Sequence, residues 1–406
     1  MTFVQGLACR ACGTRVERIA VAACPACGDQ LDPVYDWDAI RAAVDRDAVA
    51  ARPRTLWRYA ELLPLDAEPA VSREVGWSPL IDAPRLARTL DVGRVWIKFD
   101  GALFPSLSFK DRVVGVAINK ALELGLATVA CPSTGNLANA VAAHAAAAGL
   151  EAWVFVPETI EAAKTIGTAV YGPRLVRVRG TYDEINVLCR GAAAEFGWGV
   201  VNVNLRAYYG EGSRTVAYEI AEQLGWRAPA AVVAPMAGGS LVTKLAAGFG
   251  DLLRLDWIDG PAPRILGAQA AGCAPIATAV REGADDVRPV RPETIAHSIA
   301  IGNPVDGRWA VRAIRDTGGW AAAAPDHEIV ASMRLLAAET GVFGETAGGA
   351  VVAAARRLRL EGHLAADDEV VLCITGNGMK TVAAFDGHLP RVPVIEPTLH
   401  ALRELL

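Results

Sequence analysis

Short apolar runs alternate with longer stretches of helical periodicity between residues 94 and 374. Seven runs read as buried strands: VWIKF (95–99), TVAC (128–131), AWVFV (152–156), RLVRV (174–178), AVVAP (231–235), RILGA (264–268) and EVVLCI (369–374). Three segments between them repeat apolar residues at helical spacing and end at glycine: KDRVVGVAINKALELG, NLANAVAAHAAAAG and SRTVAYEIAEQLG. Apolar strands that alternate with helices predict an α/β fold, with parallel sheets covered by helices on both faces.

The first 35 residues differ from the rest, because they contain a cysteine cluster and are too few to build a core of their own. Residues 36–75 read as helices, through the segments WDAIRAAV and LWRYAELLP. We therefore predict a small module at residues 1–35, a large domain formed by residues 36–120 and 215–406, and a small α/β domain at residues 121–214.

Composition narrows the class of protein. The chain has 406 residues, about half of them hydrophobic, as in a compact α/β enzyme. The net charge of -5 is spread over interspersed acids and bases, so we expect no nucleic acid and no membrane as partner. No apolar run reaches about 18 residues, and the N-terminal segment lacks a signal-peptide pattern. We expect a cytoplasmic enzyme with a small-molecule substrate, and a homodimer.

The cysteine cluster has the spacing of a metal site. Cys9 and Cys12 form one C-x-x-C pair, and eleven residues later Cys24 and Cys27 form a second. Two such pairs place four thiolates around one zinc ion and leave no open coordination position, so the predicted role is structural. Reduced thiols without metal are the alternative. Four other cysteines stand in apolar contexts and are expected to be buried: Cys131, Cys189, Cys273 and Cys373.

Lys110 lies between a serine-rich turn and an apolar helix, in the segment SLSFKDR. The positive end of a helix dipole is unfavourable for an ammonium ion. The position therefore suits an amine that must react in its neutral form with an aldehyde. Most lysines are solvated surface charges, so the neighbouring loops decide between the two interpretations.

Three loops of small residues follow predicted strands. They are the Ser133 turn (residues 133–136, STGN), the Gly238 loop (residues 237–241, AGGSL) and the Thr375 loop (residues 375–378, TGNG). Backbone N–H groups at strand-to-helix turns bind anions, and the amide of Asn136 can donate to a phenolate oxygen. In isolation the Ser133 turn is more typical of an ordinary N-cap turn. The Gly238 loop alone is weak evidence for phosphate binding, and a glycine-rich turn is the alternative for the Thr375 loop. Because ligands bind at the carboxyl ends of strands in open α/β sheets, we predict one crevice that gathers Lys110 and these loops.

The same segments, in the same order, resemble threonine synthase, a fold-type II pyridoxal-phosphate (PLP) enzyme of the tryptophan synthase β-like superfamily. They are SFKDR around Lys110, STGN from Ser133, PMAGGSLVTK from Pro235, GETAGG from Gly344 and TGNGMKT from Thr375. The resemblance covers essentially the whole chain. SFKDR and STGN indicate the superfamily, and GETAGG and TGNG narrow it to threonine synthase. The cysteine pairs resemble the zinc ribbon that some members carry.

The resemblance implies roles for the residues of the predicted crevice. Lys110 would hold PLP as a Schiff base and later act as acid and base at the substrate carbons. Asn136 would bond the ring hydroxyl of the cofactor, and Thr375 would face its pyridine nitrogen. The cofactor phosphate would lie against the residues of the Gly238 loop, which are Ala237, Gly238, Gly239, Ser240 and Leu241.

The resemblance also implies a substrate. The family eliminates phosphate from O-phosphohomoserine and adds water at the β-carbon, which requires a second anion site. Ser133, Thr134 and Arg206 are the candidates for that site, and an ion pair at the surface is the alternative for Arg206.

Three segments depart from the family pattern. Phe104-Pro105-Ser106 stands where Asn-Pro-Thr is usual, AGGSL replaces Gly-Asn-x-Gly-Asn, and Ser78 replaces a common Thr. The alternative is therefore a paralogue that carries out elimination or replacement on another phosphorylated or acidic amino acid, similar to cysteate synthase or a serine/threonine dehydratase. A non-catalytic protein with a residual PLP site is a third hypothesis, which the intact Lys110, Asn136 and Thr375 oppose.

Overall fold

A six-stranded sheet forms the centre of the large domain. The computed structural model describes residues 2–133, 135–158, 162–180, 182–389 and 392–405. The strand order is β12-β11-β10-β13-β5-β4. All neighbours in this order run parallel except β4, which pairs antiparallel with β5. The strands are β4 (Leu80–Asp82), β5 (Arg94–Phe99), β10 (Ala231–Pro235), β11 (Arg264–Ala270), β12 (Ala321–Ala324) and β13 (Glu369–Ile374).

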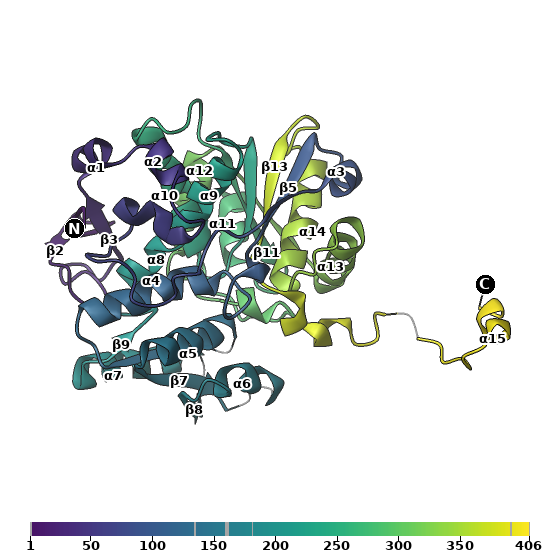
Figure 1. Cartoon of the computed structure of the whole chain (residues 1–406), viewed down its shortest axis with the longest axis horizontal. Helices are drawn as coiled ribbons and strands as arrows, with labels where there is room; N and C mark the ends of the chain where they lie inside the picture. Colours follow the sequence, from purple (N-terminus) through teal and green to yellow (C-terminus); the bar gives the residue numbers. More distant parts are fainter. Residues whose placement is uncertain (1, 134, 159–161, 181, 390–391, 406) are drawn as a thin grey trace.

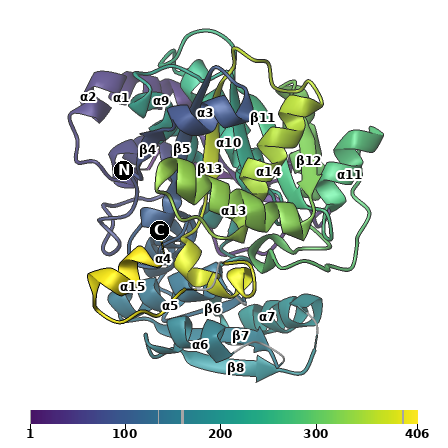
Figure 2. The same ribbon diagram turned by 90° about the vertical axis from the view of Figure 1, so that its right-hand side faces the viewer.

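Helices cover both faces of this sheet (Figures 1 and 2). One face carries α3 (Pro84–Leu90), α13 (Asp326–Thr340) and α14 (Thr346–Leu360), and the other carries α9 (Arg214–Gln223), α10 (Ser240–Arg254), α11 (Pro275–Glu282) and α12 (Gly307–Asp316). The small residues of α14 allow it to lie close to the sheet. A Cβ added at Gly348 would stand 2.9 Å from the Ile374 side chain, so a larger residue would push the helix away from β13.

A four-stranded parallel sheet lies below the large domain in Figure 1. Its order is β8-β7-β6-β9, and its helices include α5 (Asn136–Ala148), α6 (Ala162–Ala169) and α7 (Tyr182–Phe196). The alanine-rich α5 packs on β6 and β7 because its small side chains permit a close contact. The strands all fall inside the range predicted for the small domain, whose boundaries stay a prediction: β6 (Thr128–Pro132), β7 (Glu151–Pro157), β8 (Arg174–Val178) and β9 (Gly199–Val200).

The N-terminal module, residues 1–35, contains a small antiparallel sheet. Its order is β2-β1-β3, from β1 (Val4–Cys9), β2 (Arg15–Val16) and β3 (Leu31–Tyr35). The short helices α1 (Trp37–Ala43) and α2 (Arg46–Ala50) follow, as predicted. The segment LWRYAELLP forms a 3-10 helix, Leu56–Leu62, kinked at Tyr59, and not the predicted α-helical pattern. Leu7 and Leu31 of the module share the main hydrophobic core, which explains how so short a segment is stabilised.

Two further helices join the parts, and the chain ends in a tail. The helix α4 (Lys110–Glu123) packs against both α5 and α8 (Arg206–Glu211). After β13, the 3-10 helices Gly378–Lys380 and Val382–Phe385 lead to a tail with the short helix α15 (Leu399–Arg403), which stands apart from the body in Figure 1. Among the described residues, no helix has the length and apolar character to cross a membrane.

All seven strands predicted from apolar runs are present, and the fold adds strands that the sequence pattern did not predict. The strand β12 is the sequence AAAA, which has no β-preference of its own. It becomes a strand by pairing with β11. The strand β9 has two residues and is too short to leave a pattern.

Arg112, two residues after Lys110, lies at the centre of a buried cluster of charged side chains. Arg112 Nη2 lies 2.8 Å from Asp100 Oδ1, and Arg112 Nη1 lies 2.5 Å from Glu219 Oε1. Lys98 Nζ lies 2.6 Å from the other oxygen of Glu219, and the hydroxyl of Ser78 accepts a hydrogen bond from Arg112. Burial opposes ionisation of Glu219, but Arg112 and Lys98 outweigh it and lower the pKa of Glu219 to about 2. The cluster therefore ties α4 to α9 and β5.

Replacing Glu219 by Gln is expected to destabilise the fold by about 3–5 kcal/mol at pH 7, because the substitution leaves Arg112 and Lys98 undercompensated. The contribution of Glu219 is present above its ordinary pKa of 4.5 and is lost as pH falls from there to about 2. The difference between Glu219→Gln and wild type should therefore shrink in acid. Urea unfolding at pH 7 and pH 3 measures it. Glu282→Gln is the control, because the Glu282–Arg288 pair is exposed; an equal effect of both substitutions would contradict the interpretation.

Candidate active site

Lys110 begins α4, and the carboxylate of Asp111 builds the loop in front of it. The two oxygens of Asp111 accept hydrogen bonds from the backbone N–H of Ser106 at 3.2 and 3.1 Å. The N–H of Ser108 lies 3.5 Å from one of the same oxygens. The side chain of Lys110 remains half-buried, and its Nζ donates to the hydroxyl of Tyr209 at 3.0 Å. The loop is thus fixed by the Asp111 carboxylate, while the amine of Lys110 contacts the hydroxyl of Tyr209.

His144 connects this loop to the helix that follows the Ser133 turn. The Nε2 atom of His144 lies 3.1 Å from Asp111 Oδ1, and its Nδ1 atom lies 2.5 Å from the hydroxyl of Ser72. His144 and Asp111 are both buried. Because His144 belongs to α5 and Asp111 to α4, this chain of contacts holds the two helices in register.

The Thr375 loop lies directly against the Lys110 loop. The carbonyl of Thr375 accepts a hydrogen bond from the N–H of Phe109 at 2.8 Å, and the N–H of Asn377 donates to the carbonyl of Leu107 at 3.1 Å. Thr375 follows β13, which lies between β10 and β5. The structure therefore brings two of the predicted loops together at the carboxyl edge of the sheet.

Asn136, Glu345 and Lys380 form a polar group beside these loops. The side-chain amide of Asn136 donates to both oxygens of Glu345 at 3.0 Å, and its carbonyl oxygen accepts from Lys380 Nζ at 2.9 Å. Burial raises the pKa of Glu345, although Asn136, Lys380 and Lys110 act in the opposite direction. For the basic group of Lys380 burial has the opposite effect and lowers the pKa. In this arrangement the Asn136 side chain is engaged with protein groups, and its predicted bond to a ring hydroxyl stays a prediction.

Glu345, Lys380 and Tyr209 are candidate functional residues that the sequence interpretation did not assign. Glu345 and Lys380 lie inside the GETAGG and TGNGMKT segments, so those motifs contained the signal. Tyr209 lies in the segment RAYYGEG, three residues after Arg206. No sequence pattern identifies Tyr209 as a site residue, because its partner Lys110 is 99 positions away in the chain.

The Gly238 loop connects β10 to α10. Gly239 has φ +94, and a Cβ there would lie 3.0 Å from both the Asp306 carbonyl oxygen and the Ala310 side chain, so only glycine fits without strain. Beside Gly238 there is room, because an added Cβ would have its nearest neighbour, an Ile301 methyl, at 4.0 Å. The first turn of α10 has no side-chain cap, which leaves backbone N–H groups available to an anion.

The residues predicted to bind substrate lie in different surroundings. The hydroxyl of Ser133 accepts hydrogen bonds from the N–H groups of Gly135 and Ala138, as an N-cap would. Arg206 forms an ion pair with the buried carboxylate of Asp306. Thr134 lies outside the described residues. The structure thus places Arg206 in an ion pair, and its role toward a substrate stays a prediction.

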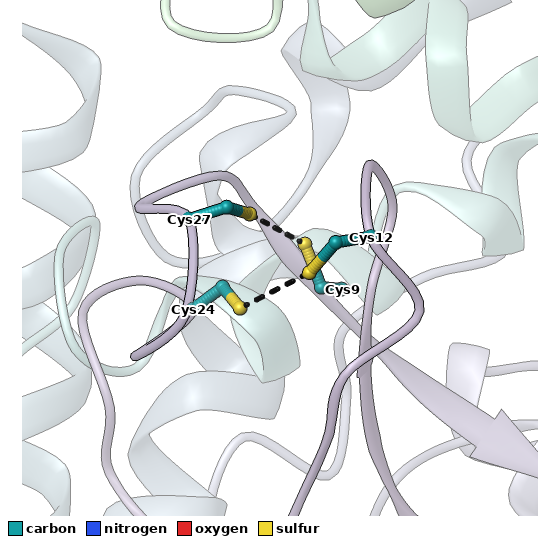
Figure 3. A group of neighbouring side chains, drawn as sticks. All are labelled: Cys9, Cys12, Cys24 and Cys27. Carbon is teal, nitrogen blue, oxygen red and sulfur yellow. Dashed lines mark hydrogen bonds between the residues drawn. The ribbon is translucent and has the colours of Figure 1, made fainter.

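The four cysteines of the N-terminal module converge (Figure 3). Cys9 and Cys12 come from one turn and Cys24 and Cys27 from another, and all four Sγ atoms lie within 4.8 Å of one another. The Sγ atoms of Cys9 and Cys27 are 3.4 Å apart, and those of Cys12 and Cys24 are 3.6 Å apart. The other four cysteines are buried, as expected: Cys131, Cys189, Cys273 and Cys373.

Comparison with known proteins agrees with this geometry. The family described as pyridoxal-phosphate dependent enzyme matches residues 71–376. Threonine synthase of Methanosarcina acetivorans is 34% identical over 403 residues, covering 98% of both chains. The chain belongs to the threonine synthase family of PLP-dependent enzymes. Threonine synthase of Synechocystis is 38% identical over 327 residues, which are 79% of this chain and 82% of the relative.

Solved structures show the same fold at lower sequence identity. Maize serine racemase has a TM-score of 0.64 and 21% identity, over 77% of this chain and 91% of that chain. Diaminopropionate ammonia lyase from Escherichia coli has a TM-score of 0.67 and 17% identity, over 84% of this chain and 91% of that chain. These neighbours establish the fold-type II architecture for this threonine synthase family member.

The residues at the sheet edge fit PLP. An aldehyde cofactor needs a lysine amine that is reachable, and Lys110 is half-buried and held by a neutral hydroxyl. Its phosphate needs uncapped N–H groups with space beside them, which the Gly238 loop offers. The two requirements are met on loops that follow strands of one sheet, so this family member has the groups that PLP requires.

Replacing Tyr209 by Phe is expected to slow the condensation of Lys110 with PLP by about 10-fold, the scale of one hydrogen bond, because the amine loses the hydroxyl that positions it. The absorbance near the visible edge that appears when PLP is added to cofactor-free protein measures the rate. Tyr208→Phe is the matched control, because the Tyr208 hydroxyl donates to the Ile19 carbonyl and not to Lys110. Equal rates in both variants and in wild type would show that Tyr209 does not hold the amine.

Proposed function

We propose that this chain is a threonine synthase, which converts O-phosphohomoserine and water to L-threonine and phosphate. The observation that carries the proposal is the amine of Lys110 at the carboxyl edge of the sheet, with the Thr375 loop in direct contact with its own loop. Similarity to threonine synthases over nearly the entire chain supports the same reaction.

The proposal assigns a place to each part of the cofactor. Lys110 would hold the aldehyde carbon, Asn136 would bond the ring hydroxyl, and Thr375 would face the pyridine nitrogen. The Gly238 loop would hold the phosphate through its N–H groups. When bound, PLP supplies an electron sink for negative charge that develops at the substrate carbons.

The side chains of this protein supply the proton transfers. The amine of Lys110, once released, is the base and acid at the substrate carbons, and the Tyr209 hydroxyl holds it in place at 3.0 Å. Asp111 and His144 fix the loop before Lys110, which keeps the amine in position. Glu345, whose pKa is raised by burial, and Lys380 hold Asn136 from both sides and so orient it.

The substrate phosphate needs a cation, and two are near the site. Arg206 is the predicted partner, together with Ser133 and Thr134, and the substrate phosphate would share its guanidinium with Asp306, which now accepts its hydrogen bond. Lys380 is a second cation, bound to Asn136 and half-enclosed by protein. The ion pair of Arg206 with Asp306 weighs equally against every anionic substrate, so it does not distinguish the paralogue from a threonine synthase.

We also propose a structural zinc ion at Cys9, Cys12, Cys24 and Cys27. Tetrahedral Zn–S bonds of 2.3 Å place sulfur atoms about 3.8 Å apart, and the Sγ separations of 3.4 and 3.6 Å are close to that value. Four thiolates form a closed site, which supplies folding energy and no chemistry. The homodimer and the cytoplasmic location stay predictions from the sequence.

Purified protein with PLP is expected to release phosphate and L-threonine in equal amounts from O-phosphohomoserine. Lys110→Ala should abolish both products and the absorbance of the bound cofactor, because it removes the amine that condenses with the aldehyde. O-phosphoserine with sulfite, L-serine and L-threonine complete the substrate panel. Turnover of one of these, with none of O-phosphohomoserine, would transfer the assignment to the paralogue; cofactor binding without any turnover would support the non-catalytic hypothesis.

A further inference from the structure

Asp306 lies between the N-terminal module and the Gly238 loop, because its buried carboxylate pairs with Arg10 of the module and its N–H donates to the carbonyl of Gly238. Asp306 Oδ1 lies 3.0 Å from Arg10 Nη1, and Arg10 stands between Cys9 and Cys12 in the first cysteine turn. The other oxygen of Asp306 pairs with Arg206. A side chain from the cysteine module therefore reaches the residue that supports the loop proposed for the cofactor phosphate.

The cysteine turn holds Arg10 firmly. Its backbone N–H donates to the carbonyl of Gln30, and Cys9 N–H donates to the carbonyl of Thr14, both at 3.0 Å. The guanidinium of Arg10 also binds Asp32 in a bidentate manner, at 2.7 and 2.8 Å. The position of the guanidinium is thus set by two things together: the turn that presents two of the four thiolates, and Asp32 of β3.

The main chain of Asp306 packs against the Gly238 loop. Its N–H donates to the carbonyl of Gly238 at 2.9 Å. Its carbonyl oxygen stands 3.0 Å from where a Cβ of Gly239 would be. The Asp306 side chain is 2% exposed. A shift of Asp306 would therefore move the backbone N–H groups at the start of α10.

A second contact of the N-terminal module holds helix α10. Asp32 Oδ1 accepts a hydrogen bond from Lys244 Nζ at 2.7 Å, and Lys244 lies one turn beyond Ser240 on α10. Lys244 also binds Glu211 at 2.5 Å, and Glu211 accepts from the Tyr35 hydroxyl of β3. The start of α10 is therefore held from the loop side through Arg10 and from the helix side through Asp32.

We propose that Asp306 is a positioning residue for the cofactor phosphate, and that Arg10 makes its placement depend on the metal-bound form of the cysteine cluster. Removing the metal releases the Cys9–Cys12 turn, Arg10 loses its fixed position, and Asp306 is left with Arg206 alone. The N–H groups of the Gly238 loop then bind phosphate less well. The inference rests on the proposed PLP site and goes beyond it, because it links two parts of the chain that otherwise have separate roles.

The first experiment compares PLP with pyridoxal, which has the same aldehyde and ring but no phosphate. Full-length cofactor-free protein carrying Arg10→Met is expected to bind PLP about 10-fold more weakly than wild type, the scale of a lost outer-shell partner. Pyridoxal affinity should be unchanged, because Lys110 is intact. Arg15→Met is the matched control, because Arg15 is an exposed arginine of the same module.

Two results would overturn the assignment of Asp306. Equal PLP affinity in wild type and Arg10→Met would remove the coupling, and equal weakening of PLP and pyridoxal would show a general loss of fold. If wild-type protein binds neither compound at Lys110, the proposed function itself fails, which is distinguishable from both results. Asp306→Asn should reproduce the selective loss, and the double variant should lose no more than either single variant, as expected of two residues that act through one contact.

The metal is tested in wild-type protein before and after treatment with a zinc chelator, with bound metal measured directly. The metal-free protein is expected to show the same selective loss of PLP affinity, and chelation of Arg10→Met should add little. Metal-free wild type that binds PLP as tightly as the metal-bound form would refute the dependence on the metal. The readout is cofactor affinity, so it does not depend on which substrate the enzyme accepts.

Discussion

The site depends on the contacts of one buried carboxylate, that of Asp111. It receives the N–H groups that shape the loop before Lys110, and it contacts His144 from the neighbouring helix. A buried carboxylate that lost these donors would carry a desolvation cost with nothing to offset it, so the loop and the helix start form together or not at all. The reactive amine is therefore presented by a rigid turn, and its hydrogen-bond partner is the hydroxyl of Tyr209.

Much of the fold could be predicted from the sequence, because wholly apolar runs mark strands that are buried on both faces. The alanine strand β12 could not, since alanine has no preference that distinguishes a strand from a helix and its pairing with β11 decides. The Lys110, Gly238 and Thr375 loops were recognisable because each adjoins a predicted strand or helix. The Asn136–Glu345 contact was not, because its two residues are 209 positions apart and neither motif reveals its partner.

Charge inside the protein is arranged in pairs that cross between segments. Arg112 joins α4 to α9, Arg214 joins Asp251 of α10 to its own helix α9, and Lys244 joins α10 to β3. Such pairs contribute little net stability compared with apolar side chains. Each pair forms, however, only when the two elements it joins are packed in one particular arrangement. They define how helices, sheet and module fit together, which the apolar core alone would leave less sharply specified.

The contact chain from Ser72 through His144 to Asp111 has a consequence for motion. It joins the first helix of the four-stranded sheet to the turn before Lys110, so those two elements move as one rigid body. The same turn is hydrogen-bonded to the Thr375 loop at the edge of the large sheet, so His144 also ties α5 to the large sheet. Any rotation of the four-stranded sheet against the large one must then hinge beyond the α4–α5 contact, and Lys110 would stay with the large sheet.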